Sequence, residues 1–216
     1  MVVSVLFPSA PVARAYQSGH APTATRGRVT RVEGRTLHEI DGLPAAEVYA
    51  RWTGGAVAVP PEGAASILAA STFHPLGREA GRVARVPFHL LAHPAVAEAG
   101  GGLTLFADVA PGEELWLMEG SADSLVARAG RVAAESRAGL AAAGGTQGDG
   151  PSGALVVYCG GCMLAVQERM EEVAQGVRDA LGGAPFLGVF TFGEQGAPLG
   201  GETRHGNLMI SCSAFG

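Results

Sequence analysis

A polar, glycine-rich segment between two apolar runs contains the residues best suited to bind a ligand. Residues 188–192 and 207–212 read as buried strands, and the segment between them holds two glutamates, an arginine and a histidine. Glycine lets a backbone approach a ligand closely, and a guanidinium is a planar donor for carboxylate or phosphate. The alternative is a solvated hairpin tip, because surface loops are usually polar. The candidate ligand-binding residues in this segment are Gly193, Glu194, Gln195, Arg204, His205 and Asn207.

Two cysteines, Cys159 and Cys162, are separated by two glycines where a strand is expected to pass into a helix. A redox dithiol there would have one thiol activated by the helix N-terminus, but Pro185 follows too soon for a thioredoxin-like fold. A zinc site would add His205 and Cys212, although the second half lacks a compact ligand spacing. The apolar surroundings favour buried, unreactive cysteines. The three interpretations remain open at this point.

The remaining motifs give little support for an enzyme. His89 and His93 are four residues apart, but neighbouring prolines predict a strand and a turn rather than a metal-binding helix. The sequence contains no Gly-x-Ser-x-Gly, phosphate-binding loop, Rossmann fingerprint or His-Glu-x-x-His motif. A nucleophile and base could come from Cys159 or Cys162 with His205. The sequence therefore favours a non-enzymatic protein.

The composition indicates a folded protein that binds neither nucleic acid nor anionic membranes. Of the 216 residues, 47% are hydrophobic and only 16% are charged, which excludes disorder and predicts a sizeable core. The net charge is −5, without a basic cluster. No apolar run approaches the roughly 20 residues of a membrane span, and three cysteines do not suggest a disulfide framework. We expect a soluble cytoplasmic protein.

The candidate residues must be positioned by the surrounding strands and helices. The sequence patterns of these elements predict an α+β fold with a mixed, largely antiparallel sheet flanked by two long helices. Ser121 is the expected N-cap of the first long helix, and a Gly pair ends the second. The turn in residues 110–114 favours an antiparallel meander. Strands are predicted over residues 2–7, 12–17, 83–89, 103–109, 114–118, 154–158, 185–192 and 207–215, a hairpin over 26–42, and helices over 44–52, 121–143 and 162–183.

Several separated segments resemble the FIST domain family, named for F-box and intracellular signal transduction proteins. "GVFTFGEQGAPLGG" followed by "RHGNLMIS" resembles the C-terminal signature of that family, and "GALVVYCGGCMLA" resembles its apolar strand, which ends in a cysteine, here Cys159. The signature positions are Gly188, Phe190, Gly193, Glu194, His205 and Asn207. The resemblance divides the chain into the end of a FIST N-terminal half, residues 1–52, and a FIST C-terminal domain, residues 53–216.

The resemblance implies a small-ligand-sensing domain of bacterial signal transduction, without catalytic residues. It implies ligands such as amino acids, bound by the polar segment and Cys159, and a signalling partner such as a histidine kinase. In this hypothesis Glu194 receives an ammonium group and Arg204 a carboxylate. The alternatives are a protein-interaction scaffold, or a haem- or zinc-binding sensor that uses His205 and the cysteines.

Overall fold

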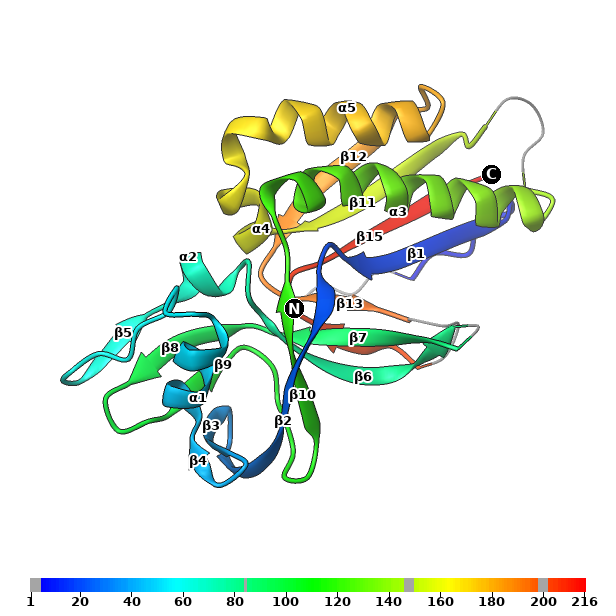
Figure 1. The fold of residues 1–216 in the computed structure, drawn as a ribbon. Coiled ribbons are helices and arrows are strands. Elements are labelled where there is room, and N and C mark those ends of the chain that lie inside the picture. Colours follow the sequence, from blue (N-terminus) through cyan, green and yellow to red (C-terminus); the bar gives the residue numbers. More distant parts are fainter. Residues whose placement is uncertain (1–4, 84, 146–149, 198–201) are drawn as a thin grey trace.

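The computed structural model describes residues 5–83, 85–145, 150–197 and 202–216. They form two large β-sheets at two levels and a separate two-stranded sheet (Figure 1). The upper sheet carries the longest helices, and the larger sheet lies below it. The chain begins in the upper sheet, descends to build the lower one, and returns to complete the upper one. Each level has its own hydrophobic core, so the junction between them is where a site can form.

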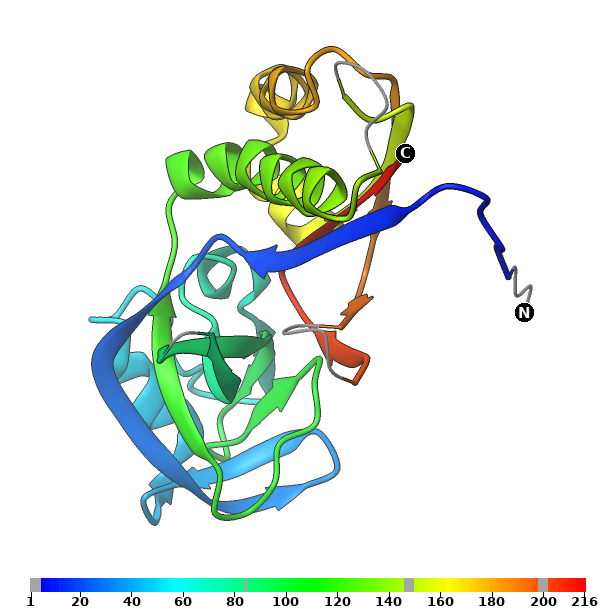
Figure 2. The ribbon, with the colours of Figure 1, turned by 90° about the vertical axis from the view of Figure 1, so that its right-hand side faces the viewer.

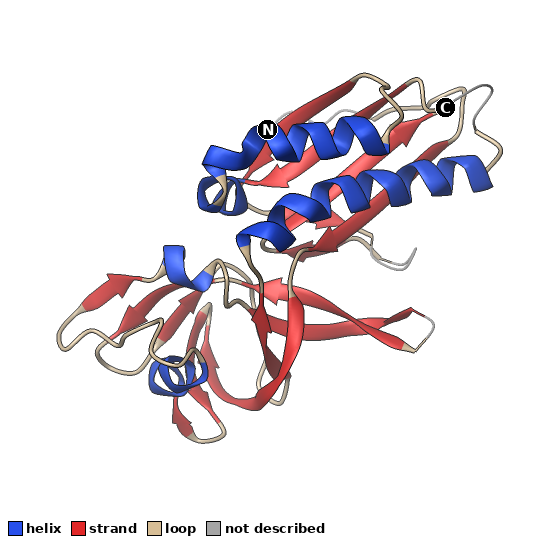
Figure 3. Cartoon of the chain, turned by 45° about the horizontal axis from the view of Figure 1, so that its top comes forward, coloured by secondary structure: helices blue, strands red, loops and turns tan. Residues whose placement is uncertain are grey.

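The upper sheet has four strands in the order β1-β15-β11-β12, and only the β11–β12 pair is parallel. Two helices, α3 and α5, cover the same face of this sheet (Figure 3). The opposite face looks toward the lower level (Figure 2). The strands are β1 (Val12–Ser18), β11 (Gly153–Cys159), β12 (Phe186–Thr191) and β15 (Met209–Phe215), and the helices are α3 (Ala122–Ala142), α4 (Gly160–Ala165), the 3-10 turn η1 (Gln167–Arg169) and α5 (Met170–Ala180).

The lower sheet is antiparallel and depends on one long strand, β2. The first half of β2 pairs with β10, and its second half pairs with β3, so that β2 joins two groups of strands. The short helices of this level are α1 (Ala45–Trp52) and α2 (Leu68–Ser71). The strands are β2 (Ala21–Glu33), β3 (Thr36–Ile40), β4 (Leu43–Pro44), β5 (Ala64–Ser66), β6 (Leu76–Val83), β7 (Val86–Ala92), β8 (Pro94–Glu98), β9 (Leu103–Leu105) and β10 (Glu114–Glu119).

The predicted α+β class and the largely antiparallel pairing are confirmed, but the single sheet with two long helices is wrong. The predicted second long helix is divided into α4, η1 and α5, because the backbone leaves the helical region at Val166 and again at Arg169. This break allows Val166 and Val173 both to reach the upper core. The helix predicted from the Ser121 cap is confirmed as α3, with a reciprocal Ser121–Ser124 capping box.

Strand pairing in the lower level also differs from the prediction. β9 pairs with β3 and β8, and β10 pairs with β2 and β6, so the predicted meander between them does not form. The predicted strand over 83–89 starts later, at Val86. Of the predicted strand over 2–7, residues 2–4 lie outside the described residues and residues 5–7 are not in a strand. The first 52 residues supply strands to both sheets.

The closest approach of α3 and α5 occurs between two glycines. A Cβ atom added to Gly130 would lie 2.9 Å from the carbonyl oxygen of Gly176, whereas one added to Gly176 would lie 3.9 Å from the Gly130 backbone. We therefore expect Gly130→Ala to destabilise the protein by about 1–2 kcal/mol through overpacking. Gly176→Ala should be neutral or stabilise by up to about 1 kcal/mol, because alanine favours helix. Urea unfolding of both variants checks this, and equal midpoints would contradict it.

Candidate functional site

A cavity of about 520 Å³ opens where the two levels meet. Its walls come from α2 below, from α4 and the end of β11 above, and from the residues before β13 (Glu194–Gly196) and β15. In Figure 1, α2 lies beneath α4 at this junction, and the two helices are in contact. Most of the lining is apolar, with Leu68, Phe73, Phe106, Leu164 and Leu208 among its members. A concave, largely apolar wall with a few polar groups is typical of small-molecule sites.

The polar segment forms a short hairpin beside this cavity. β13 pairs with β14 (Arg204–Gly206), and Glu194 stands opposite Gly206 in the register. Tyr16 supports the hairpin from β1, because its hydroxyl donates a hydrogen bond of 3.1 Å to the Glu194 carbonyl. Residues 198–201, inside the segment predicted to bind the ligand, lie outside the described residues.

Glu194 is the most deeply buried carboxylate on the cavity wall, with 2% of its surface exposed. Its Oε1 accepts hydrogen bonds from the Thr191 hydroxyl at 2.8 Å and the Gly193 amide at 3.3 Å, and its Oε2 accepts one from the Met209 amide at 3.2 Å. Burial raises the pKa of Glu194, while these donors and the positive charge of Arg128 oppose that rise. Glu194 therefore ties the hairpin to β15.

This role predicts that Glu194→Ala destabilises the fold. The substitution leaves the buried Met209 amide and two partly buried donors, Thr191 and Gly193, without an acceptor. This loss should lower the free energy of unfolding by about 2 kcal/mol. Glu62→Ala, which removes an exposed carboxylate, is the matched control and should change it by less than about 0.5 kcal/mol. Chemical denaturation at pH 7 measures both effects, and equal stability of the two variants would show that Glu194 does not anchor the hairpin.

His93 and Asn207 form a second polar group on the cavity wall. The Ser71 hydroxyl donates to the Pro94 carbonyl at 2.6 Å, so its oxygen accepts from the His93 Nε2–H at 2.9 Å. His93 thus carries its proton on Nε2, and its Nδ1 is an acceptor. The Asn207 Oδ1 accepts from the His93 backbone amide at 3.0 Å, and no partner for Asn207 Nδ2 is found in the described part of the chain.

The charge state of His93 follows from its burial. Only 5% of the residue is exposed, and burial lowers the pKa of His93 to about 4. At neutral pH the imidazole is therefore uncharged. An acceptor from His93 and a donor from Asn207 thus stand next to each other on a largely apolar wall.

The structure brings together some of the sequence-predicted site residues and leaves others apart. Cys159, Gly193, Glu194 and Asn207 line the cavity. Gln195, Arg204 and His205 do not belong to its lining. The Arg204 side chain is exposed and pairs with Glu202 at 3.0 Å, so the structure gives no support to a carboxylate-binding role for Arg204 in the cavity.

The residues named for zinc or haem do not meet in one place. His205 faces Arg35, Arg78 and Asp108, whereas Cys212 lies against Ser136 of α3, on the side of the upper sheet away from the cavity. Within the described ranges no group of three or more His, Cys, Asp or Glu residues could hold a metal ion. The Cys159, Cys162, His205 and Cys212 set therefore does not fit zinc.

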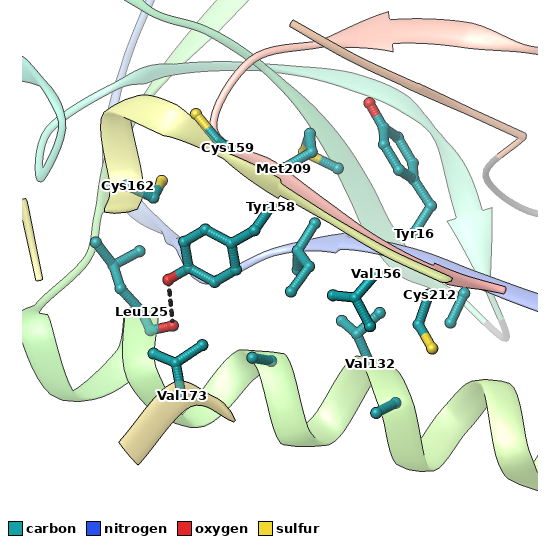
Figure 4. Close-up of a cluster of buried hydrophobic side chains, with 14 of the residues drawn as sticks. Tyr16, Leu125, Val132, Val156, Tyr158, Cys159, Cys162, Val173, Met209 and Cys212 are labelled. Atoms are coloured by element: carbon teal, nitrogen blue, oxygen red, sulfur yellow. Dashed lines mark hydrogen bonds between the residues drawn. The ribbon is translucent and has the colours of Figure 1, made fainter. Parts of the chain in front are cut away.

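A buried cation, Arg128, lies directly behind the cavity wall. Only 1% of Arg128 is exposed, and its Nη1 donates to the carbonyl of the cavity residue Leu208 at 2.7 Å. The guanidinium carbon lies 5.1 Å from the centre of the Tyr158 ring, and the Tyr158 hydroxyl in turn donates to the Leu125 carbonyl (Figure 4). Leu208 has a backbone φ of +55°, a left-handed conformation that is strained for leucine. Arg128 therefore holds a strained part of the wall in place.

Sequence reasoning missed His93 and Arg128 as site residues. The buried role of His93 rests on contacts with residues far along the chain, which no local pattern shows. Arg128 did carry a signal, because it follows Leu125 by three residues and precedes Val132 by four. A charged residue on the apolar face of a helix is rare unless it is paired.

These observations define an α+β protein with a largely apolar cavity between two sheets. The chain belongs to the FIST C domain family, a family of signal-transduction domains, because the family model for the FIST C domain matches residues 45–197, more than half of the chain. The predicted resemblance is thereby confirmed. No curated protein and no solved structure was found to match the chain. No helix within the described residues is long and apolar enough to cross a membrane.

Proposed function

We propose that this protein is a non-enzymatic sensor domain that binds a small, largely apolar molecule in the cavity between its two sheets. The observation that carries the proposal is the cavity itself, about 520 Å³ in volume, in which apolar residues surround a few convergent polar groups. Membership of a signal-transduction family supports the proposal. A signalling partner such as a histidine kinase would respond to the occupied state.

The polar groups favour a ligand with a neutral head that both donates and accepts hydrogen bonds. His93 Nδ1 offers an acceptor and Asn207 Nδ2 a donor, which suits an amide, a lactam or an alcohol. An amino acid would bring a carboxylate, and Arg204 is not on the wall to receive it. Both Glu194 oxygens already accept hydrogen bonds, so Glu194 is poorly placed to take an ammonium group as well. We therefore propose a neutral ligand in preference to an amino acid.

Two molecules with the same carbon skeleton test the charge of the ligand head. The probes are 4-methylpentanamide, which is neutral, and leucine, which is a zwitterion. Ligand at about 100 times its Kd stabilises the folded state by roughly 2.7 kcal/mol, which a thermal-shift assay resolves. We expect the amide to raise the melting temperature and leucine to leave it unchanged.

A matched pair of variants tests the place of binding. Ala69 lines the cavity and is exposed, so Ala69→Phe should narrow the site without disturbing a core. Ala138→Phe adds the same bulk on the exposed face of α3 and is the control. The amide shift should disappear only in Ala69→Phe. A leucine shift that Arg204→Ala abolishes would instead support the amino-acid hypothesis, and the absence of any shift among neutral amides, lactams and alcohols would favour a scaffold.

A further inference from the structure

Two cysteines meet at the point where β11 passes into α4. Figure 4 shows Cys159 and Cys162 together at this end of β11, with Cys212 apart from them near Val132. Cys159 and Cys162 are 5% and 0% exposed, and Cys159 lines the cavity whereas Cys162 lies behind it. Their side chains are close enough to share a hydrogen bond. All three cysteines of the chain are reduced in this structure.

The buried charge of Arg128 requires a counter-charge in this region. A guanidinium stays protonated in proteins, and an unpaired buried charge is strongly unfavourable. Arg128 Nη1 donates to a neutral carbonyl, and Nε and Nη2 have no hydrogen-bond partner in the described part of the chain. The largest favourable electrostatic interaction of Arg128 is with Cys162. A thiolate on Cys162 would supply a negative charge beside Arg128, in addition to the Glu194 carboxylate, whose pKa Arg128 also lowers.

The pKa values of Cys159 and Cys162 are consistent with their position next to Arg128. Burial opposes ionisation of Cys162, but the hydrogen bond from Cys159 and the positive charge of Arg128 outweigh it and lower the pKa of Cys162 to about 7. The same hydrogen bond, together with burial, raises the pKa of Cys159. Tyr158 and Glu194 also face the pair. The two sulfurs therefore titrate as one unit that loses the first of its two protons near pH 7.

We propose that Cys159 and Cys162 form an oxidisable dithiol on the cavity wall, which a small hydroperoxide entering the cavity converts into a disulfide. The proposal rests on the arrangement of Cys159, Cys162 and Arg128, and it does not depend on the neutral ligand proposed above. A disulfide would withdraw the thiolate from Arg128 and pull Cys159 away from the wall. Oxidation would therefore be a second signal received at the same cavity.

The oxidation balances as a two-electron reaction. The shared proton moves to Cys162, and the Cys159 sulfur attacks one oxygen of the hydroperoxide. The O–O bond breaks, the alcohol (water, for hydrogen peroxide) leaves after taking a proton from solvent, and Cys159 becomes a sulfenic acid. The Cys162 sulfur then attacks the Cys159 sulfur, the S–O bond breaks, and hydroxide leaves as water with the Cys162 proton. Two thiol sulfurs are oxidised to a disulfide while the peroxide is reduced.

The first test is a thiolate titration followed by absorbance at 240 nm. We expect a thiolate signal that appears near pH 7 in the wild-type protein and in Cys212→Ser, and that is lost in Cys162→Ser. Cys212 is a suitable control because it is also buried, at 1% exposure, and its pKa is raised by that burial. A wild-type signal that appears only at or above about pH 8.5, the pKa of a free thiol, would overturn the proposal.

The second test follows the oxidation itself. Wild-type protein treated with hydrogen peroxide should lose two hydrogen atoms by intact mass, and peptide mapping should place the new bond between Cys159 and Cys162. The rate should rise roughly tenfold between pH 6 and pH 8 as the pair loses a proton. Cys159→Ser and Cys162→Ser should not form the bond, and Cys212→Ser should. No disulfide in the wild-type protein, or one that includes Cys212, would overturn the proposal even if a variant fails to fold.

Discussion

Acidification from pH 7 to pH 4 is expected to remove several kcal/mol from the free energy of unfolding. Burial lowers the pKa of His93 to about 4, and burial together with Arg128 lowers the pKa of His20 to about 3, from an ordinary value of 6.5. Below about pH 6.5 these histidines are protonated in the unfolded chain but remain neutral in the folded protein. The free energy of unfolding therefore decreases as the pH is lowered. At 1.36 kcal/mol per pH unit, each histidine removes about 3 kcal/mol by pH 4.

The contacts of His20 explain why its imidazole remains neutral in the folded protein. The His20 Nε2 donates to the Thr72 carbonyl at 2.8 Å, and the buried Nδ1 has no partner within the described residues. A second proton on that ring would place an unpaired charge in the interior. Glu194 acts in the opposite direction, because its raised pKa makes its contribution to stability increase as the pH falls.

Urea unfolding at a series of pH values measures the effect. Between about pH 6.5 and 4.5, His20 and His93 are not the only groups with shifted pKa values. The raised pKa of Glu194 acts in the opposite direction, and the pKa values of His89 and His205 are also lowered, so single-residue variants must assign the slope. His93→Gln and His20→Gln should each flatten the pH dependence in this window. His38→Gln, which changes a histidine partly open to solvent, is the matched control for the loss of an imidazole. An unchanged slope in both test variants would refute the assignment.

Replacement of Arg128 by methionine is expected to destabilise the protein by about 3–5 kcal/mol, the range found when one partner of a buried charge pair is removed. Methionine keeps an unbranched, apolar stem like that of arginine but lacks the guanidinium group and so removes the donor to the Leu208 carbonyl. It also removes the cation over the Tyr158 ring and the positive charge beside Cys162 and Glu194. The strained Leu208 backbone would lose its direct support.

Arg131→Met on the same helix is the matched control, because Arg131 is exposed. That variant should change the free energy of unfolding by less than about 0.5 kcal/mol. Denaturant titration of both variants, with the wild-type protein alongside, gives the comparison. Similar stability of Arg128→Met and the wild-type protein would mean that Arg128 is dispensable for the fold, and would remove the electrostatic argument for a thiolate at Cys162.

Local sequence patterns predicted the elements that depend on local chemistry. The Ser121 cap marked the start of α3. The hairpin predicted over 26–42 is confirmed as β2 and β3, which turn at Gly34, where φ is positive. Glu194 and Asn207 were placed correctly at the base of the polar segment, because strand ends flank it on both sides.

The strand pairing of the lower sheet, the cavity and the role of His93 could not be predicted, because they depend on contacts between segments that are far apart in the sequence. The lower sheet pairs β2 with β10, and no turn or periodicity encodes that partnership. The cavity likewise combines α2, the residues after β7 and the start of α4, so its shape exists only after the two levels meet. His93 acquires its tautomer from Ser71 and its backbone partner from Asn207. Arg204 lies outside the cavity lining, and composition alone does not tell an exposed loop residue from a residue of a cavity wall.

The position of β15 has a consequence for the order of folding. β15 lies inside the upper sheet, between β1 and β11, and Val12 pairs with Phe215. This pairing brings together two strands from opposite ends of the sequence. Closing the long intervening loop is entropically unfavourable and slows folding. The lower level needs only residues up to β10 for its strands and can form first. Glu194 and Asn207 reach their places with β15, so the cavity should be completed in the final and slowest folding phase.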